Sequence, residues 1–501
     1  MRSLILPILT AALWEFRSLA RRHLLRSPRR SLSPYASFSV AMLVSGCTWF
    51  APDGGMSVVA NIADQELKKD VIAIRSPDEA EVAGNAVQRL LSHPLTADAA
   101  VQVALLNNRG LQATYQDLAI ADAERVGQSL PPNPTISISR IEGPIGLEIE
   151  QRVITDILAL ATLPARSEIA AARFGQEQLR AAEETLRVAH ETRRAYYRAV
   201  AAHQLVYFIA QSHSAAEAAT KFAGRLGETG AINKLDRARE QVFYADLTTQ
   251  LATAHQRESS EREALIRSMG LSGTDINFKL PGALPPLPRR VQALADIEVE
   301  AMRRRVDLQI GRIELDLLAK SWGLTQATRF INILDAGYFG KLEKDKEADR
   351  TSRMRGFDVQ LQIPLFDAGE VRTREAEAKY MQGVNRLLEL AVNVRSQARD
   401  AYRVYRSAYD IAGHYQREVL PLRKVISDET LLRYNAMLID VFSLLAQARQ
   451  RIAATVAATE AKRNFWLATV DLKAAVAGGE VSGNRNESAK SMATASESGN
   501  P

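Results

Sequence analysis

The sequence predicts a mainly α-helical protomer with a small β part, built as a tandem repeat of very long helices plus four strands. Three observations support this fold class. Helical patterns run on without a clear stop for roughly 65 residues, or about 100 Å, well beyond ordinary globular helices. Short segments between them alternate apolar and polar residues as strands do. The order of these elements then occurs a second time along the chain.

Composition allows a large protein and excludes some functions. The chain has 501 residues, is 46% hydrophobic and only 6% aromatic, and carries a formal net charge of +6. This length can hold two or three ordinary domains. The positive charge gathers near the N-terminus, so the remainder is nearer neutral. Nothing in this balance indicates nucleic-acid binding.

Residues 1–46 are expected to be an export signal. A basic stretch precedes an apolar run over 36–44, which ends in Val44-Ser45-Gly46-Cys47. This pattern resembles a bacterial lipobox, in which Cys47 is acylated and becomes the mature N-terminus, with Thr48 favouring outer-membrane sorting. The alternative is cleavage elsewhere, with Cys47 left as a free thiol. A second apolar run upstream suggests an over-called start codon, and neither run reaches the ~20 residues of a membrane span.

The first repeat is assigned to residues 96–280, after an extended mature N-terminus over 47–95. Thr96 is a suitable helix N-cap, and the helical pattern continues to about Leu130 with a break near 107–110. Prolines at 131–134 stop it. A β-hairpin follows, with strands around 136–139 and 147–150. A helix from Pro164 to about Gly227 and a second from about Lys234 to Met269 complete the repeat.

The second repeat is assigned to residues 295–478, after a proline-rich linker over 281–294. The expected elements are a helix over 295–326, a strand over 330–339, a charged loop over 341–355 and a strand over 356–363. Helices over 370–434, interrupted at Pro421, and over 441–476 follow. Residues 479–501 are rich in Ser, Gly, Asn and Glu and are expected to be disordered.

Matching segments indicate that the two units arose by duplication. Residues 104–112 match 301–309 at equal spacing, and 150–156 parallel 361–367. Ala-Arg pairs at 238–239 and 448–449 occupy similar places in the returning helices. A repeat of ~200 residues is too long for a solenoid unit.

The strands predict a membrane pore that needs several copies of the chain. Phe357, Val359, Leu361 and Ile363 share one strand face, which is expected to meet lipid. Four strands cannot close a barrel in lipid, whereas three chains would supply twelve. The residues expected to line the resulting pore are polar and alternate along the strands: Glu148, Glu150, Asp358, Gln360 and Gln362. The alternative, a soluble sheet covered by helices, leaves the very long helices unexplained.

The chain resembles the TolC family of outer-membrane efflux proteins. The motifs are Pro-Asn-Pro at 132–134, Ile-Pro-Leu-Phe-Asp-Ala-Gly at 363–369 and the internal repeat, and the resemblance covers roughly 95–478. It implies a homotrimer with a twelve-stranded β-barrel in the outer membrane and an α-helical barrel through the periplasm. The lipobox resembles the lipoprotein branch, which works with periplasmic adaptors and inner-membrane resistance-nodulation-division pumps. The segment 434–440, with Phe465-Trp466 and 477–479, is similar to members associated with copper or other heavy metals.

The resemblance also implies a constriction at the periplasmic helix tips. In the family, acidic rings and salt bridges hold that end closed. The corresponding candidates here are Asp440, Asp236 and Glu228 as acids, with Arg433 and Tyr434 as partners; each is otherwise a helix cap or solvated turn residue. The tip at 435–437 departs from the family because Asn-Ala-Met replaces a common glycine.

No catalytic constellation or cofactor motif occurs, so the chain is predicted not to be an enzyme. The spacing of His190, His203 and His213 does not suit a metal site, and no metal ligands are assigned. The leading hypothesis is a passive exit duct of a tripartite efflux system for heavy-metal ions. The alternatives are a drug or type I secretion duct and a non-transporting periplasmic coiled-coil scaffold lipoprotein.

Overall fold

The computed structural model describes residues 50–144, 146–228, 233–291, 296–345 and 350–479. The expected export signal, Cys47 and residues 480–501 lie outside this part of the chain. The described helices and strands, in chain order, are α3 (Met56–Leu67), α4 (Pro77–Leu91), α5 (Ala97–Asn107), α6 (Arg109–Ser129), β1 (Thr135–Glu142), β2 (Gly146–Asp156), α7 (Ile157–Glu228), α8 (Lys234–Met269), η1 (Gly273–Ile276), α9 (Ile297–Arg304), α10 (Val306–Ala327), β3 (Ile333–Asp345), β4 (Arg350–Gln362), α11 (Glu370–His414), a π-helical turn η2 (Tyr415–Val419), α12 (Leu420–Asn435) and α13 (Val441–Ala477).

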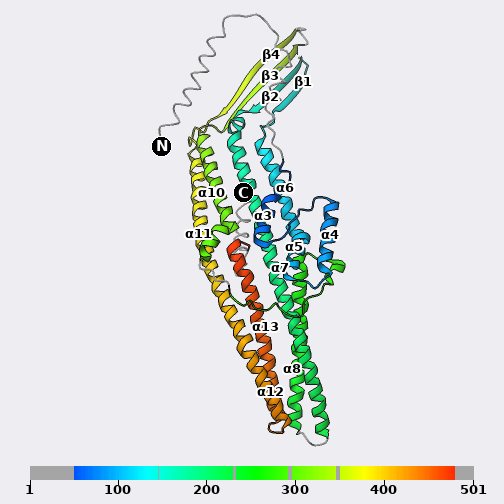
Figure 1. Ribbon diagram of the computed structural model, residues 1–501. Helices are drawn as coiled ribbons and strands as arrows, with labels where there is room; N and C mark the ends of the chain where they lie inside the picture. The colour runs from blue at the N-terminus through cyan, green and yellow to red at the C-terminus, as the bar shows by residue number, and fades with distance from the viewer. Residues whose placement is uncertain (1–49, 145, 229–232, 292–295, 346–349, 480–501) are drawn as a thin grey trace. The chain divides into compact units, whose positions relative to one another are not determined.

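The sheet continues directly into a layer of helices. The strands are antiparallel in the order β1-β2-β3-β4. α6 leads into β1, β2 into α7, α10 into β3 and β4 into α11 (Figure 1). The helices pack in the same order, with α6 on α7, α7 on α10 and α10 on α11. The mainly helical fold class with four strands is therefore confirmed.

Strands β3 and β4 are longer than the sequence pattern predicts. They pair from Ile333–Gln362 to Asp345–Arg350, so most of the expected loop over 341–355 is strand. The charged residues there give no apolar alternation, which is why the pattern did not reveal a strand. Pairing with β2 on one side holds β3 extended, since strand formation depends more on neighbours than on intrinsic preference.

The two repeats share a break in the helix that precedes each hairpin. Asn108 separates α5 from α6 with φ −68° and ψ 114°, and Arg305 separates α9 from α10 with φ −63° and ψ 121°. These two positions align in the matched segments 104–112 and 301–309. The breaks are held differently, because the Asn108 side chain accepts from the Leu111 amide whereas Arg305 donates to the Ala475 carbonyl. The similarity of the two matched segments therefore extends to backbone conformation.

Prolines affect the long helices in two ways. α7 begins at Ile157, so Pro164 lies inside the helix and the expected start at Pro164 was wrong. Asp156 starts the helix early by accepting a hydrogen bond from the Ala159 amide at 2.7 Å. In the second repeat the interruption expected at Pro421 is present, as the π-helical turn that directly precedes α12. Such a turn accommodates the proline's missing donor.

The N-terminal segment is folded against the helix layer. The expectation of an extended chain over 47–95 was wrong for α3 and α4. Ser76 and Glu79 form a capping box that begins α4, with Pro77 at its first position. The segment does lie over other elements, as expected: the Ala51 amide donates to Asp122, and α3 packs on α7.

The buried core lies where the helix layer meets this segment and the linker. Its side chains come mainly from α5, α6 and α7, and the buried Tyr115 hydroxyl bonds Thr185 at 3.0 Å. The linker crosses this region, and its backbone carbonyls accept hydrogen bonds from α13. Trp466 donates to the Pro285 carbonyl at 3.1 Å, and Lys462 donates to the Leu284 carbonyl at 2.9 Å. The Leu284 amide also donates to Gln204 of α7 at 3.0 Å, so the linker is bonded to both repeats.

Candidate functional site

The sheet has one polar and one apolar face. Directly paired residues in antiparallel strands point to the same side. The register therefore places all five candidate pore-lining residues on one face: Glu148 and Glu150 on β2 share it with Asp358, Gln360 and Gln362 on β4. The opposite face carries the apolar side chains, including Ile136, Ile138, Leu147, Ile149, Val153, Leu334, Tyr338, Leu342, Phe357, Val359 and Leu361.

Basic residues on the polar face neutralise some of its acids. Lys341 lies 2.9 Å from Glu148, and Arg152 lies 2.8 Å from Glu150. Arg152 also approaches Asp358, two strands away, at 4.0 Å. The intervening residue opposite Asp358 is Gly337, where a Cβ would lie only 2.0 Å from the Asp358 carboxylate. This glycine lets the aspartate lie across β3 toward Arg152.

The turn between α12 and α13 forms one helix tip. Met437 adopts a left-handed conformation with φ 57°, at the segment where the sequence lacks the common glycine. The Leu438 amide donates to the Arg433 carbonyl and the Met437 amide to Tyr434, both at 2.9 Å, which is a Schellman ending for α12. A methionine in this conformation costs about 1 kcal/mol relative to glycine.

The predicted gate residues lie at the tips, and no side-chain hydrogen bond or ion pair joins those whose side chains the structure describes. Asp440 is exposed and caps α13 by accepting from the Ser443 amide at 2.9 Å; hydrogen bonds from Ser443 lower the pKa of its carboxyl. Arg433 pairs with Glu429 of its own helix at 2.9 Å. Tyr434 is half-buried and Glu228 is exposed at the end of α7. Asp236 falls in α8, and its side chain lies outside the described residues.

The two tips meet through α8 and α13. The Arg449 guanidinium lies 4.7 Å from the centre of the Phe243 ring, and Phe243 and Leu247 pack with Leu445 in a small apolar cluster. Glu240 is 2% exposed, and neither of its carboxylate oxygens has a hydrogen-bond partner among the described residues. Burial raises the pKa of this carboxyl, while Arg449 opposes the shift.

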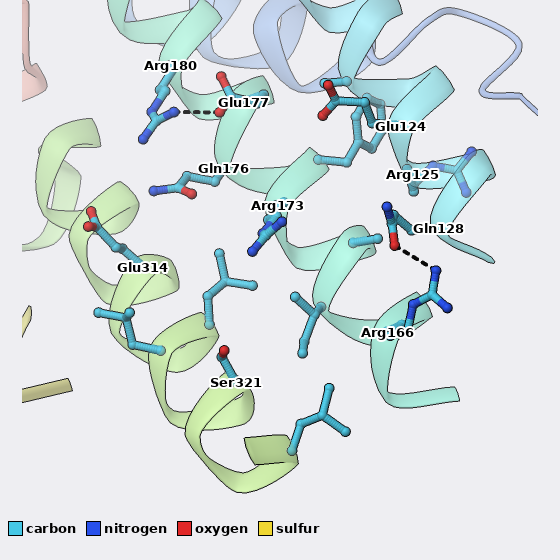
Figure 2. Close-up of a pocket in the computed structure, with 17 residues that line it drawn as sticks. Glu124, Arg125, Gln128, Arg166, Arg173, Gln176, Glu177, Arg180, Glu314 and Ser321 are labelled. Atoms are coloured by element: carbon cyan, nitrogen blue, oxygen red, sulfur yellow. Dashed lines mark hydrogen bonds and ion pairs between the residues drawn. The ribbon is translucent and has the colours of Figure 1, made fainter. Parts of the chain in front are cut away.

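A groove of about 820 Å³ runs along α7 between α6 and α10 (Figure 2). Arg166, Arg173 and Arg180 line it at seven-residue spacing, so they form one stripe of the helix. Arg166 donates to Gln128 at 2.9 Å and Arg180 pairs with Glu177. The floor is partly apolar, with side chains from α10. The groove is therefore a mixed-charge surface.

The N-terminal segment packs on α6 and α7 and reaches the edge of the groove, where a Cβ on Gly55 would lie 2.7 Å from the ring of Phe174. Gln112 of α6 bonds the backbone of Ile72 and Ile74, and α3 packs near Leu179 and Leu186 of α7. None of these residues lines the groove. Residues 50–95 therefore contact α7 largely outside the groove.

Sequence reasoning missed several members of these surfaces. Lys341 and Glu343 escaped because residues 341–355 were expected to form a loop, and Arg152 escaped because the expected strand ended at residue 150. The arginine stripe was detectable as a seven-residue repeat of one residue type along α7. The Arg449–Phe243 contact joins segments far apart in sequence, and no local pattern points to it.

The three histidines of α7 share no side-chain partner among the described residues. His203 Nδ1 lies 2.6 Å from Glu258, and His213 Nε2 lies 3.1 Å from Thr248. His190 is 4% exposed, and burial lowers its pKa to about 3, so this imidazole is neutral. In the described part of the chain, no three His, Cys, Asp or Glu side chains converge as metal ligands. Within the same residues, no helix combines the length and the apolarity that crossing a membrane needs.

Comparisons by sequence found no match, either to a family model or to a curated protein. Comparison of structures found close matches in fold. The *Campylobacter jejuni* CmeC outer membrane channel superposes with a TM-score of 0.65 at 16% identity, over 79% of this chain and 88% of that one. CusC, described in connection with transmembrane channel formation, gives 0.63 at 17%, over 79% and 92%. The open *Neisseria gonorrhoeae* MtrE outer membrane channel gives 0.59 at 16%, over 76% and 88%. The chain therefore has the TolC-like fold of these outer membrane channels.

Proposed function

We propose that three copies of this chain form an outer-membrane exit duct of a tripartite efflux system. The observation that carries the proposal is the continuation of four strands into four helices in the same order. A sheet with one apolar face and one polar face, extended by helices of up to 72 residues, suits a barrel that continues as a duct. The fold shared with known outer membrane channels supports the same reading.

The edges of the sheet explain why several copies are needed. β1 and β4 each have a partner on one side only, and unpaired backbone groups in lipid cost several kcal/mol each. Three copies pair β4 of one chain with β1 of the next and close twelve strands. The acids and amides at 148, 150, 358, 360 and 362 then line the lumen.

Partners, anchoring and cargo complete the proposal. The repeats, over 96–280 and 295–478, end in tips that would meet a periplasmic adaptor and an inner-membrane resistance-nodulation-division pump. Cys47 would carry the lipid anchor. The resemblance of 434–440 to heavy-metal-associated members makes heavy-metal ions the proposed cargo. Loss of metal tolerance on deletion of the gene, without loss of drug tolerance, would support this cargo over the alternatives.

Channel formation separates the duct from the coiled-coil scaffold. Detergent-extracted trimers that conduct ions in planar bilayers are expected for a duct. A delipidated, water-soluble monomer without conductance would overturn the proposal.

The gate assignment is tested by changing Asp440 to Asn. The amide can still cap α13, so stability should hold while one negative charge per chain is lost. We expect lower cation selectivity and altered single-channel conductance. Unchanged values for both would remove Asp440 from the gate. Asp428→Asn, an exposed residue of α12, is the control for the same charge change elsewhere at the tip.

A further inference from the structure

The apolar face of the sheet ends in basic side chains at the hairpin end. The register places Arg140, Lys344, Arg353 and Arg355 on that face. We call these four residues the basic rim. They come from β1, β3 and β4, and all four are exposed.

On β4 the rim residues follow the apolar side chains, whereas Ile149 of β2 and Leu342 of β3 lie in the same rung as Arg140 and Arg353. On β4 the same face presents Leu361, Val359 and Phe357, followed by Arg355 and Arg353 toward the hairpin. At about 3.4 Å per residue, Arg355 lies roughly 7 Å past Phe357 and Arg353 roughly 14 Å past it. On β4 the change from apolar to basic side chains therefore occurs between Phe357 and Arg355.

The rim has a net positive charge. Arg140 pairs with Glu142 at 3.1 Å. Lys344, Arg353 and Arg355 have no ion-pair partner among the described residues. On the polar face of the same strands, by contrast, Lys341 and Arg152 are paired with glutamates.

We infer that the basic rim binds phosphate-bearing headgroups of anionic lipids at the outer surface of the membrane. The inference rests on the proposed function, which turns the apolar face toward lipid and the hairpin end outward. The basic rim, at the hairpin end of the apolar face, then lies at the depth of the lipid headgroups. Guanidinium groups match phosphate oxygens in charge and in geometry. Unpaired basic groups at that level are attracted to an anionic surface.

A different role for these residues is protection of the edge strand. Charged side chains on an edge such as β4 discourage pairing with other chains. That role predicts aggregation when the charges are removed and makes no demand on lipid phosphate. The two readings are therefore separable by experiment.

The test measures binding of lipid A to the purified trimer in a neutral detergent. The probes are lipid A, the same lipid stripped of its phosphates, and inorganic phosphate. The variant Lys344→Gln/Arg353→Gln/Arg355→Gln removes the unpaired charges of the rim. The control Lys341→Gln/Arg350→Gln removes two basic residues from the polar face of the same strands.

We expect the triple variant to bind lipid A at least about tenfold more weakly than the wild type, since each basic group near an anionic surface contributes several-fold. The control should bind within about twofold of the wild type, and the difference should shrink in high salt. Dephosphorylated lipid should not distinguish the variants, and inorganic phosphate should not compete at comparable concentration.

Several results would overturn the inference. These are equal lipid A binding by the triple variant, an equal loss in the polar-face control, or aggregation of the triple variant with unchanged binding by its soluble trimers. Bilayer conductance of the wild type is recorded in parallel. Conducting trimers without phosphate-dependent lipid binding would reject the basic rim alone, whereas absence of conductance would reject the proposed duct.

Discussion

Glu183 makes the stability of the helix layer depend on pH. It lies on α7, beside the break between α9 and α10. Burial, reinforced by the nearby Asp307 carboxylate, raises the pKa of Glu183 to about 7, against a partial opposing effect of Arg305. The ordinary pKa of this carboxyl is 4.5. Between pH 4.5 and about pH 7, the folded protein therefore keeps a proton that the unfolded chain has released. The stabilisation from this proton is fully present below pH 4.5 and is lost as pH rises through 7.

The change Glu183→Gln should remove this dependence. Linkage with the two pKa values gives a contribution of about 2 kcal/mol that is present at pH 5.5 and absent at pH 8. The variant should therefore gain more stability over the wild type at pH 8 than at pH 5.5, by about 2 kcal/mol. The stability of both proteins also depends on pH in the opposite sense through His190, because burial favours its neutral imidazole. Comparing the variant with the wild type at each pH cancels this shared contribution.

Denaturant unfolding of the detergent-solubilised trimer, followed by circular dichroism at both pH values, measures this difference. Glu124→Gln on α6, an exposed carboxylate, is the control and should show no such pH effect. An equal gain for Glu183→Gln at pH 5.5 and pH 8 would refute the reasoning, because it would mean that the buried carboxyl has an ordinary pKa.

Two backbone predictions follow from glycine geometry. Met437→Gly should stabilise the tip by about 1 kcal/mol because glycine adopts φ 57° without strain, whereas Met437→Ala should not. Denaturant unfolding midpoints of the two variants measure this difference. Equal gains in stability for both would contradict backbone strain at Met437. Gly270→Ala should destabilise by more than about 2 kcal/mol, because φ is 67° and the new Cβ would lie 2.8 Å from the Asn107 carbonyl oxygen. Gly127→Ala in α6 meets open space and should be neutral or slightly stabilising in the same assay; similar behaviour of both alanines would show that the backbone at Gly270 relaxes.

Periodicity predicted the elements well where one face of the element is apolar. The α5–α6 break, the Thr96 cap and the α8 bounds could be predicted because local residue types determine them. Strand ends rich in charge, such as 341–345 and 350–355, could not, because neighbouring strands rather than local preference hold them extended. The shared polar face of Glu150 and Asp358 was predictable from alternation. The bridge between them through Arg152 depends on Gly337 of a third strand, and no single strand contains that information.

The two repeats pass from strand to helix by different means. In the first, Asp156 is the last residue of β2 and also accepts from the Ala159 amide, so the chain enters α7 without a turn. In the second, Pro364 follows the end of β4, and a turn that ends in the left-handed residues Ala368 and Gly369 leads into α11.

Only glycine fits at position 369, the last residue of that turn, since a Cβ there would lie 2.1 Å from the Arg329 carbonyl oxygen. Asp367 supports it by accepting from the Gly369 amide at 3.1 Å. The aspartates at 156 and 367 are therefore the functional match between the junctions, and the apolar residues before them were free to diverge. The helix layer requires that each strand lead into its helix in the correct order. At both junctions, an aspartate that accepts a hydrogen bond from a backbone amide supports this connection.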